Sequence, residues 1–149
     1  MGAPDRAVQV GVECHAVLER LDFKAPAVPE GTDPEAAKIL KKFFKSAPFK
    51  ALAASEILAR ELPFVIPRQG QIVQGVIDVV YRRGGKVVVS DYKSDKSMKP
   101  GDYALIREIY TEAVRRVLKV DPVFTLIYLR HGEEIEVNAK GEAVRAQNR

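Results

Sequence analysis

The stretch from Gly75 to Asp95, GVIDVVYRRGGKVVVSDYKSD, is the part of the chain from which the rest can be interpreted. Two runs rich in Val, Ile and Tyr, Ile72 to Tyr81 and Lys86 to Tyr92, are typical of β-strands. The residues between them, Arg82 to Gly85, end in two glycines, and glycine supplies the positive φ angles that a tight reversal requires. The sequence therefore predicts a β-hairpin.

Charged side chains lie near the open end of this hairpin. Alternation along a strand puts Asp91 and Lys93 on one face, with their Cα atoms roughly 6.5 to 7 Å apart. Asp78 ends the apolar run of the preceding strand, and pairing across the glycine turn would bring it close to Asp91. Buried charge is costly unless it is paired or bound to a metal. Two carboxylates and the backbone carbonyl of Tyr92 would suit Mg²⁺, whereas a simple ion pair at a strand end explains the same spacing without chemistry.

The pattern Gly75-x-Ile77-Asp78, followed by Asp91-Tyr92-Lys93-Ser94-Asp95, resembles the core of PD-(D/E)XK nucleases. It is most similar to the nuclease domain at the end of RecB-type and AddA-type helicase-nucleases, where a G-x-I-D strand precedes D-Y-K-T-D. The resemblance implies an α/β fold, a restriction-endonuclease-like α/β/α sandwich with a mixed central sheet. It also implies Mg²⁺ or Mn²⁺ as cofactor and DNA as substrate.

Apolar residues recur at helical spacing near the start of the chain, which predicts an amphipathic helix over about residues 6–22. His15 lies beside this apolar stripe, where it is either a half-buried histidine bonded to a neighbour or a ligand for a divalent metal. The pattern Gly11-x-x-x-His15-x-x-Leu18-Glu19, followed by Leu21-Asp22-Phe23, resembles the first-helix motif of the same nucleases. The resemblance implies that His15 is a metal ligand.

After a connector over residues 24–31, Asp33 is predicted to cap a helix that has Pro34 at its first position and runs to about Lys45. Its lysines form either a solvated basic face or a contact surface for a phosphate backbone, and Lys41 and Lys42 are candidates for DNA contact. A further helix is predicted from about residue 46 to residue 60.

The segment Arg60-Glu61-Leu62-Pro63-Phe64 resembles the R-E-x-P-F segment that precedes the hairpin in these nucleases. The resemblance implies that Glu61 lies near the metal site and supports catalysis. An exposed charge at a junction between helix and strand is the alternative explanation of this glutamate.

Beyond the hairpin, Asp102 is predicted to cap a helix that extends to about Lys119. Relatives carry Tyr-x-x-Gln-x-x-x-Tyr here, and this chain keeps Tyr103 and Tyr110 but has Ile106 in place of the glutamine. The resemblance implies DNA contact by both tyrosines, with core packing as the alternative for Tyr110. Two more strands are predicted: a strand buried on both faces over residues 123–129, and an edge strand over residues 133–137.

The composition fits one globular domain over residues 1–149, with a core over about 8–137 and a tail over 138–149 that frays or forms a loose turn. The single cysteine, Cys14, excludes an internal disulfide and a cysteine-based metal cluster. No apolar run approaches the ~20 residues of a membrane span. We therefore expect a soluble, cytoplasmic protein that does not bind membranes. The net charge of +4 adds a weak preference for polyanions.

These observations predict a metal-dependent DNA nuclease in DNA repair or recombination, acting with, or derived from, a helicase. The candidate metal ligands are His15, Asp78, Asp91 and the Tyr92 carbonyl, and Lys93 is the candidate for orienting water or stabilising the developing charge. The chain has no glycine-rich phosphate loop of the ATPase type, so any motor would lie in another polypeptide or another domain. A nuclease-fold scaffold that binds DNA or a protein without cutting is the alternative.

Overall fold

The predicted hairpin is part of a mixed sheet in the computed structural model, which describes residues 3–145. Within these residues the sheet has six strands in the order β1-β2-β3-β4-β5-β6, one parallel pair among antiparallel ones, and flanking helices. This is the predicted α/β class, and it is consistent with a restriction-endonuclease-like fold. The chain divides into two compact units. The first comprises residues up to 54, 92–98 and 127–134, and the second comprises 55–91, 99–126 and the residues from 135 onward.

The central hairpin joins β2 (Gln71–Arg83) to β3 (Lys86–Lys93). The two strands are antiparallel, and their register runs from Arg83↔Lys86 to Val79↔Ser90. Gly84 and Gly85 form the connection with φ angles of 57° and 79°. Positive φ at both positions is what a two-residue turn between twisted strands requires, so the hairpin prediction is confirmed.

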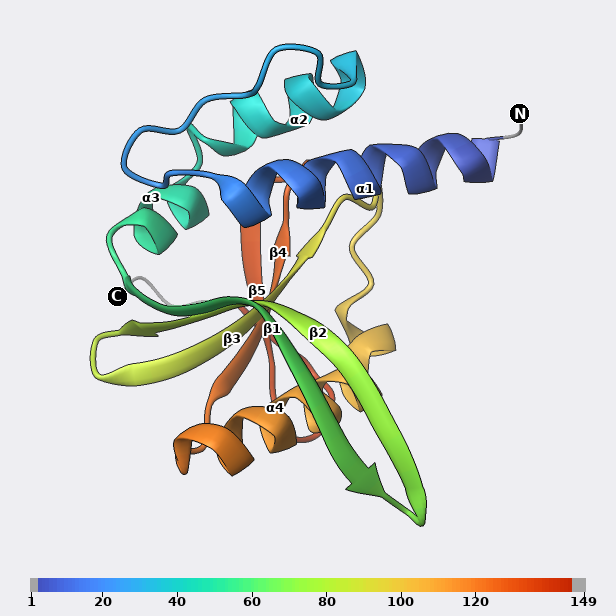
Figure 1. The fold of residues 1–149 in the computed structure, drawn as a ribbon, viewed down its shortest axis with the longest axis vertical. Helices are drawn as coiled ribbons and strands as arrows, with labels where there is room; N and C mark the ends of the chain where they lie inside the picture. The colour runs from blue at the N-terminus through green and yellow to red at the C-terminus, as the bar shows by residue number, and fades with distance from the viewer. Residues whose placement is uncertain (1–2, 146–149) are drawn as a thin grey trace. The chain divides into compact units, whose positions relative to one another are not determined.

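The strand β1 (Glu56–Arg68) pairs with β2 along its whole length, from Glu56↔Arg82 to Arg68↔Gln71. The prediction of a helix through residue 60 is wrong, because α3 (Ala47–Ala53) ends earlier and residues 56–60 belong to β1. These residues pair with the apolar end of β2, and the resulting ladder of hydrogen bonds outweighs a local preference for helix. Figure 1 shows β1 and β2 as the green arms of one long hairpin.

The strands β3 and β4 (Val123–Tyr128) are neighbours, and the buried hydroxyls of Ser90 and Thr125 share a hydrogen bond between them. The helix α4 (Ala104–Leu118) connects these strands, as expected of the parallel pair, which needs a crossover connection. The predicted cap at Asp102 is wrong. That residue lies inside a short 3₁₀ helix, η1 (Pro100–Tyr103), and Tyr103 occupies the N-cap position of α4 without a side-chain hydrogen bond.

The strand β5 (Glu133–Val137) was expected at the edge of the sheet, but β6 (Ala143–Arg145) pairs with its outer side. The expected frayed tail is therefore a paired strand as far as residue 145, while residues 146–149 lie outside the described part of the chain. The tail is too polar to predict a strand by periodicity. It pairs because a short turn that includes Gly141, with a φ of 78°, returns the chain along β5.

The first unit is built on α1 (Ala3–Arg20) and α2 (Pro34–Phe43), which lie side by side (Figure 1). The predicted apolar stripe of α1 is buried, as is the inner face of α2. The carboxylate of Asp33 caps α2, as expected, by accepting hydrogen bonds from the backbone N–H groups of Glu35 and Ala36. None of the helices over residues 3–145 is apolar and long enough to cross a membrane.

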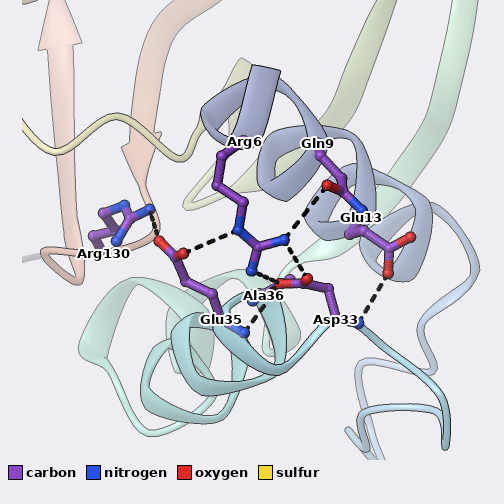
Figure 2. A network of polar contacts seen from close by, with 7 residues as sticks. All are labelled: Arg6, Gln9, Glu13, Asp33, Glu35, Ala36 and Arg130. Carbon is purple, nitrogen blue, oxygen red and sulfur yellow. Dashed lines mark hydrogen bonds and ion pairs between the residues drawn. The ribbon is translucent and has the colours of Figure 1, made fainter. Parts of the chain in front are cut away.

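Ionic contacts join these two helices. The Arg6 guanidinium on α1 lies 2.6 Å from a carboxylate oxygen of Asp33, and its Nε lies 3.7 Å from a carboxylate oxygen of Glu35 (Figure 2). The same glutamate accepts a hydrogen bond of 2.7 Å from Nη2 of Arg130. Two arginines from distant parts of the sequence thus meet at one carboxylate near the start of α2.

Candidate metal centre

The carboxylates of Asp78 and Asp91 are close together in the second unit. The β2–β3 ladder ends at Val79↔Ser90, and one further step in the same register sets Asp78 opposite Asp91. Their carboxylate oxygens lie within 4.8 Å of each other, and the residues are only 9% and 8% exposed. Two anions so close and so poorly hydrated repel each other strongly, and a bound cation would relieve this repulsion.

Glu61 extends the pair of aspartates to a third strand. The register Arg60↔Val79 and Leu62↔Ile77 sets Glu61 opposite Asp78, so the predicted position at a junction between helix and strand is wrong. Its φ angle is 47°, an unusual value for a residue other than glycine, and such backbone strain is frequent at functional sites. Glu61, Asp78 and Asp91 therefore occupy matching positions on β1, β2 and β3, and we call them the acidic row.

Tyr110 on α4 lies near the acidic row. Its ring packs edge-on against Phe64 and Phe124, with centroids 5.6 and 6.0 Å apart, and its hydroxyl donates to the Val76 carbonyl at 3.3 Å. Burial raises the pKa of the Tyr110 phenol well above its ordinary value, and the negative charges of the acidic row raise it further. Core packing, the alternative that the sequence left open, is thus present, and the phenol is a neutral hydrogen-bond donor beside three carboxylates.

Gly75, the first residue of the G-x-I-D pattern, makes room for an aromatic ring. A Cβ atom at this position would lie 2.9 Å from the ring of Phe64, which is closer than real side chains approach. Phe64 itself follows Glu61 on β1 and contacts Tyr110. The glycine therefore lets one ring pack between β2 and α4, close in sequence to the acidic row on both strands.

In the first unit, His15 has a defined hydrogen-bond partner. Its Nδ1 atom lies 2.9 Å from the backbone carbonyl of Gly11. A carbonyl oxygen can only accept, so Nδ1 carries the proton and Nε2 has the lone pair in the neutral ring. Histidine ligands of metals commonly have this arrangement, with the second nitrogen donating to a carbonyl. The ring also meets Tyr92 edge-on, with centroids 6.0 Å apart.

Gly11 also allows the end of β3 to approach α1. A Cβ atom on Gly11 would lie 3.0 Å from the Ser94 hydroxyl, so any larger residue would push Ser94 away. The glycine and histidine of the first-helix motif thus lie against the Tyr92–Ser94 part of the strand motif. This contact gives a physical reason for the spacing Gly11-x-x-x-His15.

Lys93, half-buried at the end of β3, has its backbone held from two directions. Its carbonyl accepts a hydrogen bond of 2.9 Å from the Leu129 N–H, and the next carbonyl, that of Ser94, accepts one of 2.6 Å from Nε of Arg130. The sequence analysis did not identify Arg130, because its partner Ser94 lies 36 residues away. An arginine directly after a buried strand, in a predicted turn, was the only available signal.

The remaining predicted site residues are placed as follows. The Tyr92 side chain is 3% exposed, and ligation through its carbonyl stays a prediction. Tyr103 is half-buried at the end of η1, and Lys41 and Lys42 are exposed in the last turn of α2. By unit, His15, Tyr92, Lys93 and the two lysines belong to the first, and the acidic row and both tyrosines of the α4 region belong to the second.

Curated proteins similar to this chain are AddA-type components of ATP-dependent helicase/nucleases. The one from Streptococcus suis is 29% identical over 154 residues, which cover 87% of this chain and 13% of that protein. The protein of the same name from Streptococcus agalactiae is 24% identical, over 87% of this chain and 12% of its own length. The one from Lysinibacillus sphaericus is 32% identical, over 52% of this chain and 8% of its own length.

These matches support a relationship to AddA-type proteins, which the motifs had predicted. The chain spans no more than 13% of the length of these relatives. No family model matches the chain.

Proposed function

We propose that this chain is a metal-dependent nuclease domain of the PD-(D/E)XK type that hydrolyses phosphodiester bonds of DNA. The observation that carries the proposal is the close approach of two buried carboxylates, Asp78 and Asp91, the second of which precedes Lys93 by two residues on the same strand. The similarity to proteins named as helicase/nuclease components supports it.

The donor set fits a divalent cation. His15, Asp78 and Asp91 each offer one ligand atom, and together they are a group that could hold a metal ion. One imidazole nitrogen with carboxylate oxygens suits Mn²⁺, and the oxygens suit Mg²⁺ as well; the Tyr92 carbonyl is a further oxygen donor. When bound, such an ion lowers the pKa of a coordinated water and polarises a phosphoryl oxygen.

The chain's own groups then have separate tasks. Gly11 holds the His15 ring by accepting from Nδ1, so that Nε2 is presented as the ligand atom. The Lys93 ammonium stabilises the negative charge that develops on the phosphoryl oxygens or orients the attacking water. Glu61 adds a third carboxylate beside Asp78 and is the group best suited to support a second cation.

We further propose that the domain works with a helicase protein or domain in DNA repair or recombination, in the cytoplasm. The relatives' names join helicase and nuclease, and this chain has no ATP-binding loop of its own. Tyr103 and Lys42 are the proposed contacts to DNA outside the metal centre.

A DNA-binding or protein-binding scaffold without nuclease activity is the second candidate. The observation that favours it is Ile106, which stands half-buried on α4 where the resembled nucleases carry a glutamine. An aliphatic side chain cannot donate the hydrogen bond that an amide would provide at this place.

Cleavage of labelled single- and double-stranded DNA in Mg²⁺ or Mn²⁺ separates the two candidates. The unaltered chain should cut, and Lys93→Ala and Asp78→Ala should not. Asp102→Asn, which removes an exposed carboxylate from the same unit as Asp78, should cut like the unaltered chain. DNA binding without cutting by the unaltered chain would favour the scaffold. Cutting that survives both Lys93→Ala and Asp78→Ala would overturn the proposed site.

A further inference from the structure

The first unit contains a pocket of about 350 Å³ that is rich in positive charge. Its lining has four cationic side chains, one carboxylate and one aliphatic side chain: Lys38, Lys42, Lys96, Arg130, Glu35 and Ile39. Neither the composition nor the motifs of the sequence predicted this hollow. A concave surface with this charge is suited to a polyanion rather than to an apolar ligand.

Three separate segments bring the cations together. Lys38 and Lys42 are four residues apart on α2, so they lie on the same face of that helix. Lys96 comes from the loop after β3, and Arg130 comes from the turn after β4. All of these residues belong to the same compact unit. The pocket is thus a feature of the tertiary fold of that unit and not a run of lysines along one helix.

The one carboxylate in the lining is already neutralised. Glu35 accepts a hydrogen bond of 2.7 Å from Arg130, and Arg6 lies 3.7 Å away on its other side (Figure 2). Arg130 lowers the pKa of Glu35 most, and the charges of Arg6 and Lys96 lower it further, so the group stays ionised and engaged with the arginines. The three lysines therefore supply positive charge in excess of what Glu35 balances.

The pocket is attached to the strand that carries Lys93. Arg130 donates to the carbonyl of Ser94, the residue after Lys93, at 2.6 Å. Lys96 follows Lys93 by three residues, so their Cα atoms are at most about 11 Å apart. Along one DNA strand, phosphates follow each other at about 3.4 Å of axial rise, so this is a distance of roughly three nucleotides.

We propose that this pocket binds a backbone phosphate of the DNA strand, a few nucleotides from the bond that is cut. The inference rests on the proposed function, because DNA is the polyanion whose phosphates would fall at this distance from Lys93. Lys38, Lys42 and Lys96 make the phosphate contact, and Arg130 couples the pocket to the backbone of the catalytic strand. The side chain of Lys41 is outside the pocket lining, although the sequence had suggested it together with Lys42.

Binding of a fluorescent single-stranded oligonucleotide tests this inference when EDTA is present to prevent cleavage. Affinities of Lys38→Gln, Lys42→Gln and the double variant are measured between about 50 and 200 mM salt. Lys50→Gln, which removes an exposed lysine from α3 in the same unit, is the matched control. Each lost phosphate contact should reduce the slope of log affinity against log salt by about 0.7. The Lys50→Gln slope should equal that of the unaltered chain.

The outcomes separate the pocket from the nuclease. Slopes of the pocket variants that equal the Lys50→Gln slope would overturn the inference, whether or not the unaltered chain cuts DNA. Absence of DNA binding by the unaltered chain would overturn it as well. A reduced slope in the pocket variants, with no cleavage by the unaltered chain in Mg²⁺ or Mn²⁺, would support the pocket and overturn the proposed nuclease alone.

Discussion

Asp78 and Asp91 face each other across two antiparallel strands, with their carboxylate oxygens within 4.8 Å and their side chains almost excluded from solvent. The hairpin itself produces this geometry, because the register set by the glycine turn continues from Val79↔Ser90 to these two residues. A pair of ionised carboxylates in this position costs free energy, and such a cost persists in proteins where a ligand or a function offsets it.

Replacing Lys93 should separate chemistry from binding. Lys93→Met keeps most of the aliphatic stem and removes the ammonium, so cleavage of DNA should fall by about 10²-fold or more while Mn²⁺ affinity stays the same or rises. Single-turnover cleavage and a Mn²⁺ titration measure the two effects. Equal losses of cleavage and of Mn²⁺ binding would show that Lys93 supports the fold of the site and not the reaction.

Replacing Tyr110 distinguishes its ring from its hydroxyl. Tyr110→Phe keeps the contacts with Phe64 and Phe124 and loses a long hydrogen bond, so it should lower the free energy of unfolding by less than about 1 kcal/mol. Tyr110→Ala should cost on the order of 3 kcal/mol. Urea unfolding measures both. A Tyr110→Phe variant that is stable but defective in DNA binding would assign the hydroxyl to DNA contact.

The phenol of Tyr110 also predicts a dependence on alkaline pH. Its pKa is raised in the folded state above the ordinary value of 10.0, so the unfolded chain loses this proton first. The stabilising contribution is fully present below about pH 10 and is lost as the pH rises through the raised folded-state pKa. In Tyr110→Phe this part of the decline should be missing when unfolding is compared at neutral and alkaline pH. Identical declines in both proteins would contradict the prediction.

The ion pairs between α1 and α2 predict a dependence on acidic pH. Arg6 is the largest cause of the lowered pKa of Asp33, and Arg130 is the largest cause of the lowered pKa of Glu35. Folded values below the ordinary 3.8 and 4.5 mean that this stabilisation is present above those values. It is lost as the pH falls through the lowered folded-state values. Arg6→Gln should flatten the acid limb of a plot of unfolding free energy against pH, and an unchanged limb would contradict this assignment.

The glycine of the G-x-I-D pattern should be required for packing. Gly75→Ala would place a methyl group about 2.9 Å from the Phe64 ring and should cost about 1 to 3 kcal/mol of stability. Combining it with Phe64→Leu should recover part of this loss, because the smaller side chain relieves the overlap. Additive losses in the double variant, measured by urea unfolding, would show that the ring is not the obstacle.

Local signals in the sequence were sufficient for the hairpin, α1 and the cap of α2. Gly84 and Gly85 require the turn, and Asp33 with Pro34 is a strong helix start. Residues 56–60 and the pairing of β6 depend instead on partners distant in sequence, so local preference predicted them wrongly. Long-range pairing of this kind is not expressed in a helical or alternating pattern of the segment itself.

The candidate site divides in the same way. Its aspartates were predictable because one turn fixes the register of both strands. Two features were not: the position of Glu61 opposite Asp78, with a positive φ, and the contact of Arg130 with Ser94. Each depends on how separate segments pair or pack, which residue spacing does not reveal.

Binding of Mn²⁺ by the unaltered chain, followed by electron paramagnetic resonance of the free ion, tests the central claim most directly. The account predicts a site that His15→Ala, Asp78→Asn and Asp91→Asn each weaken strongly and that Asp102→Asn leaves intact. The bound ion should also stabilise the fold by about 2.7 kcal/mol at a hundred times its dissociation constant. Undiminished Mn²⁺ binding in all three site variants, or no binding by the unaltered chain, would contradict the account.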